Sequence, residues 1–161
     1  MKRIVLVRHA KAEDIYDNIT DFDRALTKKG NNDSFIIAKR IKSLNIFPGL
    51  VISSPASRAF ETAINFVKEL NYSDEKIILE NNLYYNFNAD KLLKYIKTIN
   101  KEFENIFIFG HNPTLTYFAN ILLKKDYISL PKCGAVGILF KMENWNEINE
   151  AEREKVFYEF P

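Results

Sequence analysis

Short apolar runs recur along the chain, and each of them stops at polar residues or at Gly and Pro. The runs at 4–7, 50–52, 77–79, 106–109 and 135–140 are rich in Ile, Val, Leu and Phe, and residues 155–160 form a weaker run. Runs of this kind are typical of buried β-strands. We therefore predict strands at the first five positions and a short edge strand with a hairpin partner at the last.

Between these runs, apolar residues recur at helical spacing, and each predicted helix has residues suited to its start. The expected N-caps are Thr27, Ser54, Asn88 and Asn112, and Pro55 and Pro113 are the expected first residues of the second and fourth helices. The apolar face of the first helix is predicted to comprise Phe35, Ile36, Ala38, Ile41 and Leu44. Strands that alternate with helices predict an α/β fold, a three-layer α/β/α sandwich with a mostly parallel central sheet.

Composition supports a single domain over residues 1–161. The chain has 161 residues, of which 47% are hydrophobic and 14% aromatic, enough for a core that needs neither a disulfide nor a metal. Cys133 is the single cysteine, which excludes an internal disulfide and a multi-cysteine metal site. No arginine follows Cys133 closely, so we interpret it as a packed or surface cysteine and not as the nucleophile of a thiol phosphatase.

Charge and hydropathy exclude two classes of partner. The 23 basic and 21 acidic residues nearly cancel, so no extended nucleic-acid surface is predicted. No apolar run approaches the length that spans a membrane, and the run after Met1 is too short for a signal peptide. We expect a cytoplasmic protein without a nucleic-acid or membrane partner, and the sequence leaves its oligomeric state open.

Cations and imidazoles follow three of the predicted strands. Arg8 and His9 end the first strand, Arg58 lies in the first helical turn after the second, and His111 follows the fourth. His9 and His111 are the only histidines in the sequence. One Arg-His pair is more often a surface feature than a site, because short motifs match by chance. Parallel strands, however, end at one edge of a sheet, where α/β proteins bind ligands, so the combination predicts a site.

These motifs resemble those of the histidine phosphatase superfamily. The similar segments are Arg8-His9, Ser53-Ser54-Pro55-x-x-Arg58-Ala59 and Gly110-His111-Asn112-Pro113. The opening Arg8-His9-Ala10-Lys11-Ala12 and the segment Asp23-Arg24-x-Leu26-Thr27-x-x-Gly30 are similar to the small, SixA-type branch of phosphohistidine phosphatases. The resemblance extends along most of the chain and implies a phosphoglycerate mutase-like fold.

The resemblance also implies the role of each site residue. His9 is implied to be the nucleophile that becomes a phosphohistidine, while Arg8, Arg58, His111 and Asn112 bind the phosphoryl group, with no metal or other cofactor. Neighbouring arginines disfavour a protonated His9, whereas a phosphate dianion favours a protonated His111. We therefore expect the two histidines to differ in protonation in a substrate complex.

Two positions depart from the superfamily pattern. Ala10 stands where Gly is most frequent, and Glu61 stands where Gln is usual. Glu61 lies one helical turn from Arg58 and is therefore within reach of that arginine.

The segment from Lys11 to Arg24 is polar and irregular. It contains Asp14, Asp17, Asp21 and Asp23 and the aromatic residues Tyr16 and Phe22. It is suited either to covering a substrate or to being a solvated connection. We expect Arg24 to pair with these acids, and Tyr84, Tyr85 and Phe87 to pack in the core or at the rim of the site.

Glu80, just beyond the third strand, is the only well-placed candidate for a general acid, and a solvated loop residue is an equal interpretation. Without an acid, substrates with good leaving groups are favoured, and the labile P–N bond of phosphohistidine fits. The prediction is a metal-independent phosphatase acting on a phosphohistidine protein or a small phosphorylated compound. One alternative is a phosphomonoesterase or mutase for a small metabolite, and another is a non-catalytic phosphate-binding module.

Overall fold

A mixed sheet forms the centre of the molecule in the computed structural model, which describes residues 1–16, 18–85 and 87–161. Asp17, one of the predicted loop acids, lies outside the described residues. Within them the sheet has six strands, in the order β3-β2-β4-β1-β5-β6. The strands are β1 (Lys2–Arg8), β2 (Leu50–Ser53), β3 (Ile78–Leu79), β4 (Asn105–Gly110), β5 (Ala135–Phe140) and β6 (Arg153–Glu159).

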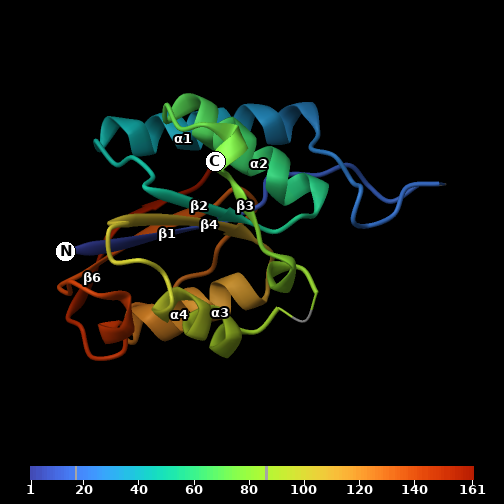
Figure 1. Ribbon diagram of the computed structural model, residues 1–161. Coiled ribbons are helices and arrows are strands. Elements are labelled where there is room, and N and C mark those ends of the chain that lie inside the picture. Colours follow the sequence, from blue (N-terminus) through green and yellow to red (C-terminus); the bar gives the residue numbers. More distant parts are fainter. Residues whose placement is uncertain (17, 86) are drawn as a thin grey trace.

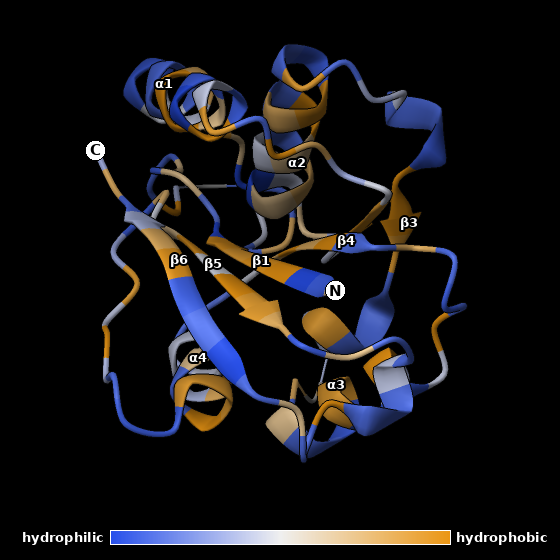
Figure 2. Ribbon diagram, turned by 90° about the vertical axis from the view of Figure 1, so that its left-hand side faces the viewer, coloured by the Kyte–Doolittle hydropathy of each residue, from blue (hydrophilic) through white to orange (hydrophobic). Residues whose placement is uncertain are grey.

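The sheet is mostly parallel, as predicted. Strands β3, β2, β4 and β1 run in one direction, while β5 is antiparallel to β1, and β6 is antiparallel to β5. The central strands are apolar except near their ends, whereas β6 at the edge is largely hydrophilic, as Figure 2 shows. Charged residues on an edge strand disfavour pairing with another chain.

Helices cover both faces of the sheet, which confirms the three-layer α/β/α prediction (Figure 1). On one face lie α1 (Lys28–Ser43) and α2 (Ser57–Glu69), and on the other lie α3 (Ala89–Lys97) and α4 (Thr114–Leu123). Each face has its own apolar core, because alternate residues of the strands point to opposite sides. Val5 and Val7 pack toward α1 and α2, and Ile4 and Leu6 pack toward α3 and α4.

Two of the predicted N-caps are confirmed. The Thr27 side chain accepts a hydrogen bond from the Gly30 backbone amide at the start of α1. Asn88 Oδ1 accepts from the amides of Asp90 and Lys91 at the start of α3.

The other two N-cap predictions are wrong. Helix α2 begins at Ser57 with Ala56 as its N-cap, and α4 begins at Thr114 with Pro113 as its N-cap. The Ser54 hydroxyl bonds to the ring of His111, and the Asn112 side chain binds the Leu130 carbonyl and Thr116. Pro55 and Pro113 therefore precede the helices, where the sequence predicted them to be the first helical residues.

The predicted apolar face of α1 is wrong in part. Ala38 and Ile41 are buried as expected, but Ile36 is 45% exposed and Leu44 46% exposed. Ser34 and Ile37 are buried in their place. At the start of the helix Gly30 lies against the Lys11 carbonyl, and a Cβ atom would be only 2.1 Å from that oxygen. A contact with a residue this far back in the chain cannot be derived from hydrophobic spacing.

No helix in the described part of the chain is long and apolar enough to cross a membrane.

Candidate active site

His9 lies directly after β1, at the edge of the sheet where the parallel strands end. Its backbone is held from two sides, because the His9 amide donates to the Gly110 carbonyl (3.0 Å) and the Cys133 amide donates to the His9 carbonyl (3.1 Å). His9 Nδ1 lies 2.8 Å from the Ala10 carbonyl oxygen. A carbonyl oxygen only accepts, so Nδ1 carries the ring hydrogen. Nε2, which makes no hydrogen bond within the described residues, is left with its lone pair.

The environment keeps this imidazole neutral. His9 is 7% exposed, and burial is the largest effect that lowers its pKa, to about 4. The charges of Arg58, Arg8 and Arg24 lower the pKa further, against the opposing effect of the bond to Ala10. His9 is therefore unprotonated, and so able to act as a nucleophile, at neutral pH.

His111 lies beside His9, with 5.2 Å between the ring centroids. It follows β4, and its Nε2 lies 2.8 Å from Ser54 Oγ. Its Nδ1 is buried and has no hydrogen-bonding partner in the described structure. Burial, and then the proximity of His9 and Arg58, lower the pKa of His111 to about 3. Both rings are thus neutral in the ligand-free protein, and the expected difference in a substrate complex stays a prediction.

Arg58 lies in the first turn of α2, as the sequence predicted, and is 7% exposed. Both outer nitrogens of its guanidinium bind Asp21. Nη1 donates to the Asp21 carbonyl (2.6 Å), and Nη2 donates to Asp21 Oδ2 (3.0 Å). The segment after β1, which extends outward on the right of Figure 1, is thereby tied to α2.

Two further side chains bind the Asp21 carboxylate. Arg24 Nη1 lies 3.1 Å from Oδ1, which confirms the predicted pairing of Arg24 with a loop acid. The Tyr84 hydroxyl donates to Oδ2 at 2.9 Å. Partial burial opposes ionisation of Asp21, but the bond from Tyr84 and the charge of Arg58 outweigh it and lower the carboxyl pKa. Asp21 is therefore a carboxylate that partly neutralises the arginines of the site.

Arg8 and Asn112 meet at one backbone oxygen. Arg8 Nη1 and Asn112 Nδ2 both donate to the Leu130 carbonyl, at 3.0 and 2.9 Å. Asn112 Oδ1 also accepts from the amide and the hydroxyl of Thr116. The Asn112 amide is thus largely committed to the protein, and a role in phosphate binding stays a prediction for it. Arg8 Nε is buried and unpaired within the described residues.

A hollow opens beside these groups, which we call the His111 hollow. Its lining residues are Arg58, Leu83, Tyr84, Phe87, His111, Asn112 and Thr114. The ring of Tyr84 lies edge-on to His111 at 5.6 Å and below the Arg58 guanidinium at 5.9 Å. The hollow therefore combines a cation and an imidazole with an aromatic wall, a suitable surface for an anion with an organic group attached.

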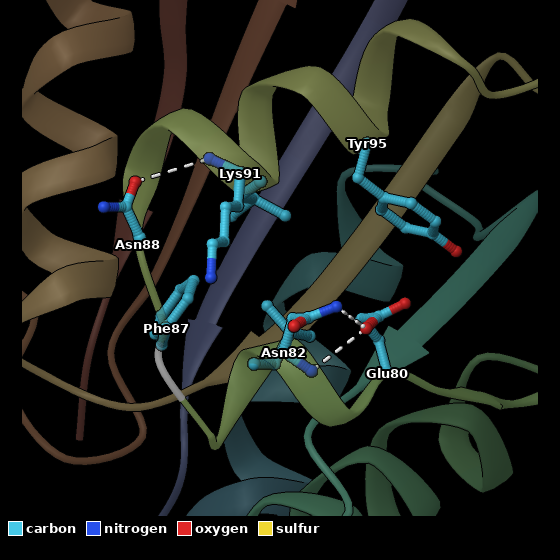
Figure 3. A pocket seen from close by; sticks show the side chains of 8 residues that line it. Glu80, Asn82, Phe87, Asn88, Lys91 and Tyr95 are labelled. Carbon is cyan, nitrogen blue, oxygen red and sulfur yellow. Dashed lines mark hydrogen bonds between the residues drawn. The ribbon is translucent and has the colours of Figure 1, made fainter.

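Glu80 lies in a neighbouring pocket, shown in Figure 3. The Glu80 carboxylate caps a short 3₁₀ helix (Asn81–Leu83), accepting from the Asn82 backbone amide (3.0 Å) and from Asn82 Nδ2 (2.8 Å). Leu83 and Phe87 line both pockets, so the two adjoin each other. Glu80 is not among the described residues that line the His111 hollow, and a general-acid role stays a prediction.

Thr62 links two parts of the site, and the sequence analysis did not single it out. Its hydroxyl accepts from the Ala10 amide (3.0 Å) and donates to the Arg58 carbonyl (2.6 Å), which joins the segment after β1 to α2. The signal is the spacing of four between Arg58 and Thr62, which puts them on one face of a helix. Glu61, expected within reach of Arg58, instead accepts from the Leu26 amide at 2.7 Å.

The remaining candidates concern sulfur and metals. Cys133 is fully buried, and burial raises its thiol pKa to about 12, which confirms the interpretation as a packed cysteine. Across the described residues there is no group of three or more His, Cys, Asp or Glu side chains arranged to hold a metal ion.

Comparison with solved structures identifies the fold. SixA from Agrobacterium tumefaciens superposes on the chain with a TM-score of 0.83, covering 99% of this chain and 98% of that chain at 23% sequence identity. A structure of the protein histidine phosphatase SixA complexed with tungstate gives a TM-score of 0.83 over 98% and 96% of the chains, at 18% identity. The fold is that of the SixA histidine phosphatases. This confirms the predicted phosphoglycerate mutase-like architecture.

Curated relatives of the SixA-fold chain match over shorter segments. The serine/threonine-protein phosphatase Pgam5 of Drosophila ananassae, a mitochondrial protein, is 34% identical over 77 residues, which are 48% of this chain and 26% of Pgam5. An uncharacterized chloroplastic protein of Arabidopsis thaliana is 38% identical over 61 residues, 38% of this chain and 28% of that protein. The matched segments thus span about a quarter of each curated relative. No model of a known protein family matches the chain.

Proposed function

We propose that this protein is a metal-independent phosphatase of the histidine phosphatase superfamily, in its SixA-type branch, and that His9 forms a covalent phosphohistidine during turnover. The observation that carries the proposal is the state of the His9 ring. Nδ1 is bound to the Ala10 carbonyl, Nε2 has a free lone pair, and the pKa of about 4 keeps the ring unprotonated. A neutral imidazole fixed in this way is a competent nucleophile.

The reaction proceeds in two displacements. In the first, the Nε2 lone pair of His9 forms a bond to phosphorus, the bond from phosphorus to the leaving group breaks, and the departing atom keeps the electron pair and takes a proton from solvent water. In the second, water attacks phosphorus and gives up one proton to the solvent, the P–N bond breaks, and His9 regains its lone pair as phosphate leaves. Arg8 and Arg58 bind the phosphoryl oxygens, for which the planar guanidinium is suited, and His111 donates to a third.

A phosphohistidine protein is the proposed substrate. The described residues that line the His111 hollow include no carboxylate that would serve as a general acid. The imidazole of phosphohistidine leaves with less assistance than an alkoxide, so the proposed site suits it best. A solved structure of the same fold carries the name protein histidine phosphatase, which supports this choice. The location in the cytoplasm, expected from the sequence, stays part of the proposal.

Trapping the intermediate tests the proposal directly. A protein phosphorylated on histidine with ³²P is mixed with the enzyme, and the reaction is quenched in alkali within one turnover. We expect label on His9, located by mass spectrometry, and loss of both label and turnover in His9→Ala. Unchanged phosphatase activity in His9→Ala would overturn the proposal and leave a phosphate-binding module or another nucleophile as the explanation.

The small-metabolite alternative makes a different prediction. A phosphomonoesterase or mutase needs a working acid, and Glu80 is the candidate that adjoins the hollow. Turnover of a phosphohistidine protein and of sugar phosphates is therefore compared in the wild type and in Glu80→Gln. We expect the phosphohistidine protein to be the better substrate and Glu80→Gln to leave its turnover within twofold. Preference for sugar phosphates, lost in Glu80→Gln, would support the alternative.

A further inference from the structure

Ser54 binds the ring of His111 from inside the protein. It follows the last residue of β2, is 0% exposed, and has its Oγ 2.8 Å from His111 Nε2. The two residues are brought together by the sheet, since the Ser54 amide donates to the carbonyl of Phe109, near the end of β4. The N-cap of α2 is Ala56, and the only contact of the Ser54 hydroxyl with the start of that helix is a long bond from the Ala56 amide, at 3.3 Å.

The direction of this hydrogen bond follows from counting donors. Ser54 Oγ also accepts a hydrogen bond from the Ala56 amide at 3.3 Å, and an amide cannot accept in return. The Ser54 hydroxyl hydrogen therefore needs an acceptor, and leaving it unpaired in a fully buried position is costly. Within the described residues, the only acceptor bonded to this hydroxyl is His111 Nε2. Ser54 donates, His111 Nε2 accepts, and the hydrogen of the neutral ring is on Nδ1.

We infer that Ser54 is a positioning residue that holds His111 in the tautomer with hydrogen on Nδ1, so that the neutral ring donates a hydrogen bond to a phosphoryl oxygen. Nδ1 is the ring nitrogen that has no hydrogen-bonding partner in the described structure, and the His111 ring lines the His111 hollow, so Nδ1 is the nitrogen left for a ligand. The inference rests on the proposed function for the identity of the ligand. The assignment of the tautomer itself does not depend on it.

The inference explains how two identical side chains serve opposite purposes. His9 and His111 both carry hydrogen on Nδ1, but the protein binds different nitrogens. The Ala10 carbonyl engages Nδ1 of His9 and leaves the Nε2 lone pair for attack on phosphorus. Ser54 engages Nε2 of His111 and leaves the Nδ1 hydrogen for donation. With a pKa of about 3, His111 is neutral in the ligand-free protein, and without Ser54 its hydrogen would be free to occupy the other nitrogen.

Long-range ¹H–¹⁵N NMR of uniformly labelled protein at pH 7 tests the tautomer without any turnover. The chain has only two histidines, so the spectrum of His111→Gln assigns all signals. In the wild type we expect His111 with a protonated Nδ1 and an unprotonated Nε2. In Ser54→Ala we expect a mixture of tautomers or the Nε2-protonated form.

Ser53→Ala is the matched control. Ser53 is a neighbouring serine of equal burial whose hydroxyl donates to the Ser54 carbonyl and, in the described structure, is not hydrogen-bonded to His111. We expect His111 in Ser53→Ala to have the same tautomer as in the wild type. Ser54→Thr retains the hydroxyl, and we expect it to retain the Nδ1-protonated ring.

Titration with inorganic phosphate provides the second measurement. We expect the His111 Nδ1 hydrogen signal to move on binding, and Ser54→Ala to bind phosphate about tenfold more weakly, the scale of one lost hydrogen bond. Ser53→Ala and Ser54→Thr should bind within threefold of the wild type.

A wild-type His111 with its hydrogen on Nε2 would overturn the inference, as would an unchanged tautomer in Ser54→Ala. If Ser54→Ala does not fold, the wild-type spectrum still decides. The proposed function is tested separately by the activity of His9→Ala. If His111 has the expected tautomer but His9→Ala retains full phosphatase activity, the role of Ser54 stands and the proposed reaction is wrong.

Discussion

Asp21 holds both outer nitrogens of Arg58, with its carboxylate 3.0 Å from Nη2 and its carbonyl oxygen 2.6 Å from Nη1. Asp21 supplies the counter-ion of the buried Arg58 guanidinium in the ligand-free protein, and solvent screens this pair in part from the side of the exposed Asp21 side chain. The proposed substrate brings a dianion to the same guanidinium. The carboxylate and the phosphoryl group therefore compete electrostatically for Arg58.

Removing the charge of Asp21 should strengthen phosphate binding. Asp21→Asn keeps a hydrogen-bond acceptor for Arg58 but removes the negative charge, and we expect phosphate affinity by isothermal titration to rise about tenfold at low salt. Stability should fall by only about 1 kcal/mol, because the Asp21 side chain is 42% exposed.

Asp23→Asn is the matched control for this substitution. Asp23 lies in the same segment and bonds to the Thr20 hydroxyl, so its loss of charge should leave phosphate affinity nearly unchanged. Weaker phosphate binding in Asp21→Asn would show that Asp21 orients Arg58 and does not compete with the ligand.

The two histidines should respond differently to phosphate. In the free protein the pKa is about 4 for His9 and about 3 for His111, so both stay neutral down to pH 5. A bound dianion favours the imidazolium of His111 and raises its pKa, while Arg8 and Arg58 continue to disfavour a protonated His9. NMR titration with and without phosphate measures both values. Equal changes at the two rings would contradict the assignment of nucleophile and donor.

Acid should destabilise the protein through these same rings. Their pKa values are lower in the folded protein than the value of about 6.5 in an unfolded chain, so the unfolded state binds more protons below that pH. Each histidine should lower the unfolding free energy by about 1.4 kcal/mol per pH unit between pH 6.5 and its folded pKa. Urea unfolding at pH 7 and pH 5 measures this loss of unfolding free energy. The loss between the two pH values should be smaller in His111→Gln than in the wild type. An equal loss in the two proteins would assign the acid sensitivity to other groups.

The sequence predicted those features whose causes lie close together in the chain. The runs at 4–7 and 106–109 are buried strands because every residue in them is apolar, and the polar residues that end them are therefore at the sheet edge. This argument correctly placed His9 and His111 side by side. The caps at Thr27 and Asn88 were predictable for the same reason, since each bonds to an amide within three residues.

Features that depend on distant partners were not predictable. Ser54 resembles an N-cap by local rules, but its hydroxyl bonds to a ring 57 residues away. Asp21 was only one of several acids in a segment without periodicity, and its selection depends on Arg58 and Tyr84, which come from two other parts of the chain. Hydrophobic spacing contains no information about either pairing.

Thr62 should be required for stability through its hydroxyl and not through its shape. Thr62→Val keeps the volume but leaves the buried Ala10 amide without its acceptor, and we expect a loss of about 1–3 kcal/mol in denaturant unfolding. Activity should also fall, because the bond fixes the residue after His9 to the turn that carries Arg58. Thr62→Ser keeps the hydroxyl and should retain most of both. An equal loss of stability in Thr62→Val and Thr62→Ser would show that the hydroxyl is not the cause.

A substitution at Gly30 distinguishes the effect of helix propensity on stability from the effect of steric fit. Alanine favours a helix over glycine by about 1 kcal/mol, so propensity alone predicts that Gly30→Ala stabilises α1. A Cβ atom at this position would be 2.1 Å from the Lys11 carbonyl oxygen. That oxygen is fixed by bonds from the Thr27 amide (2.9 Å) and hydroxyl (3.2 Å), so it cannot withdraw without breaking its bonds from the N-cap residue of α1. We expect a net loss of about 2–4 kcal/mol in denaturant unfolding. Asn32→Ala, at an exposed position of the same helix, should change stability by less than about 0.5 kcal/mol. A Gly30→Ala protein as stable as Asn32→Ala would show that the Lys11 carbonyl moves away from α1 at little cost in stability.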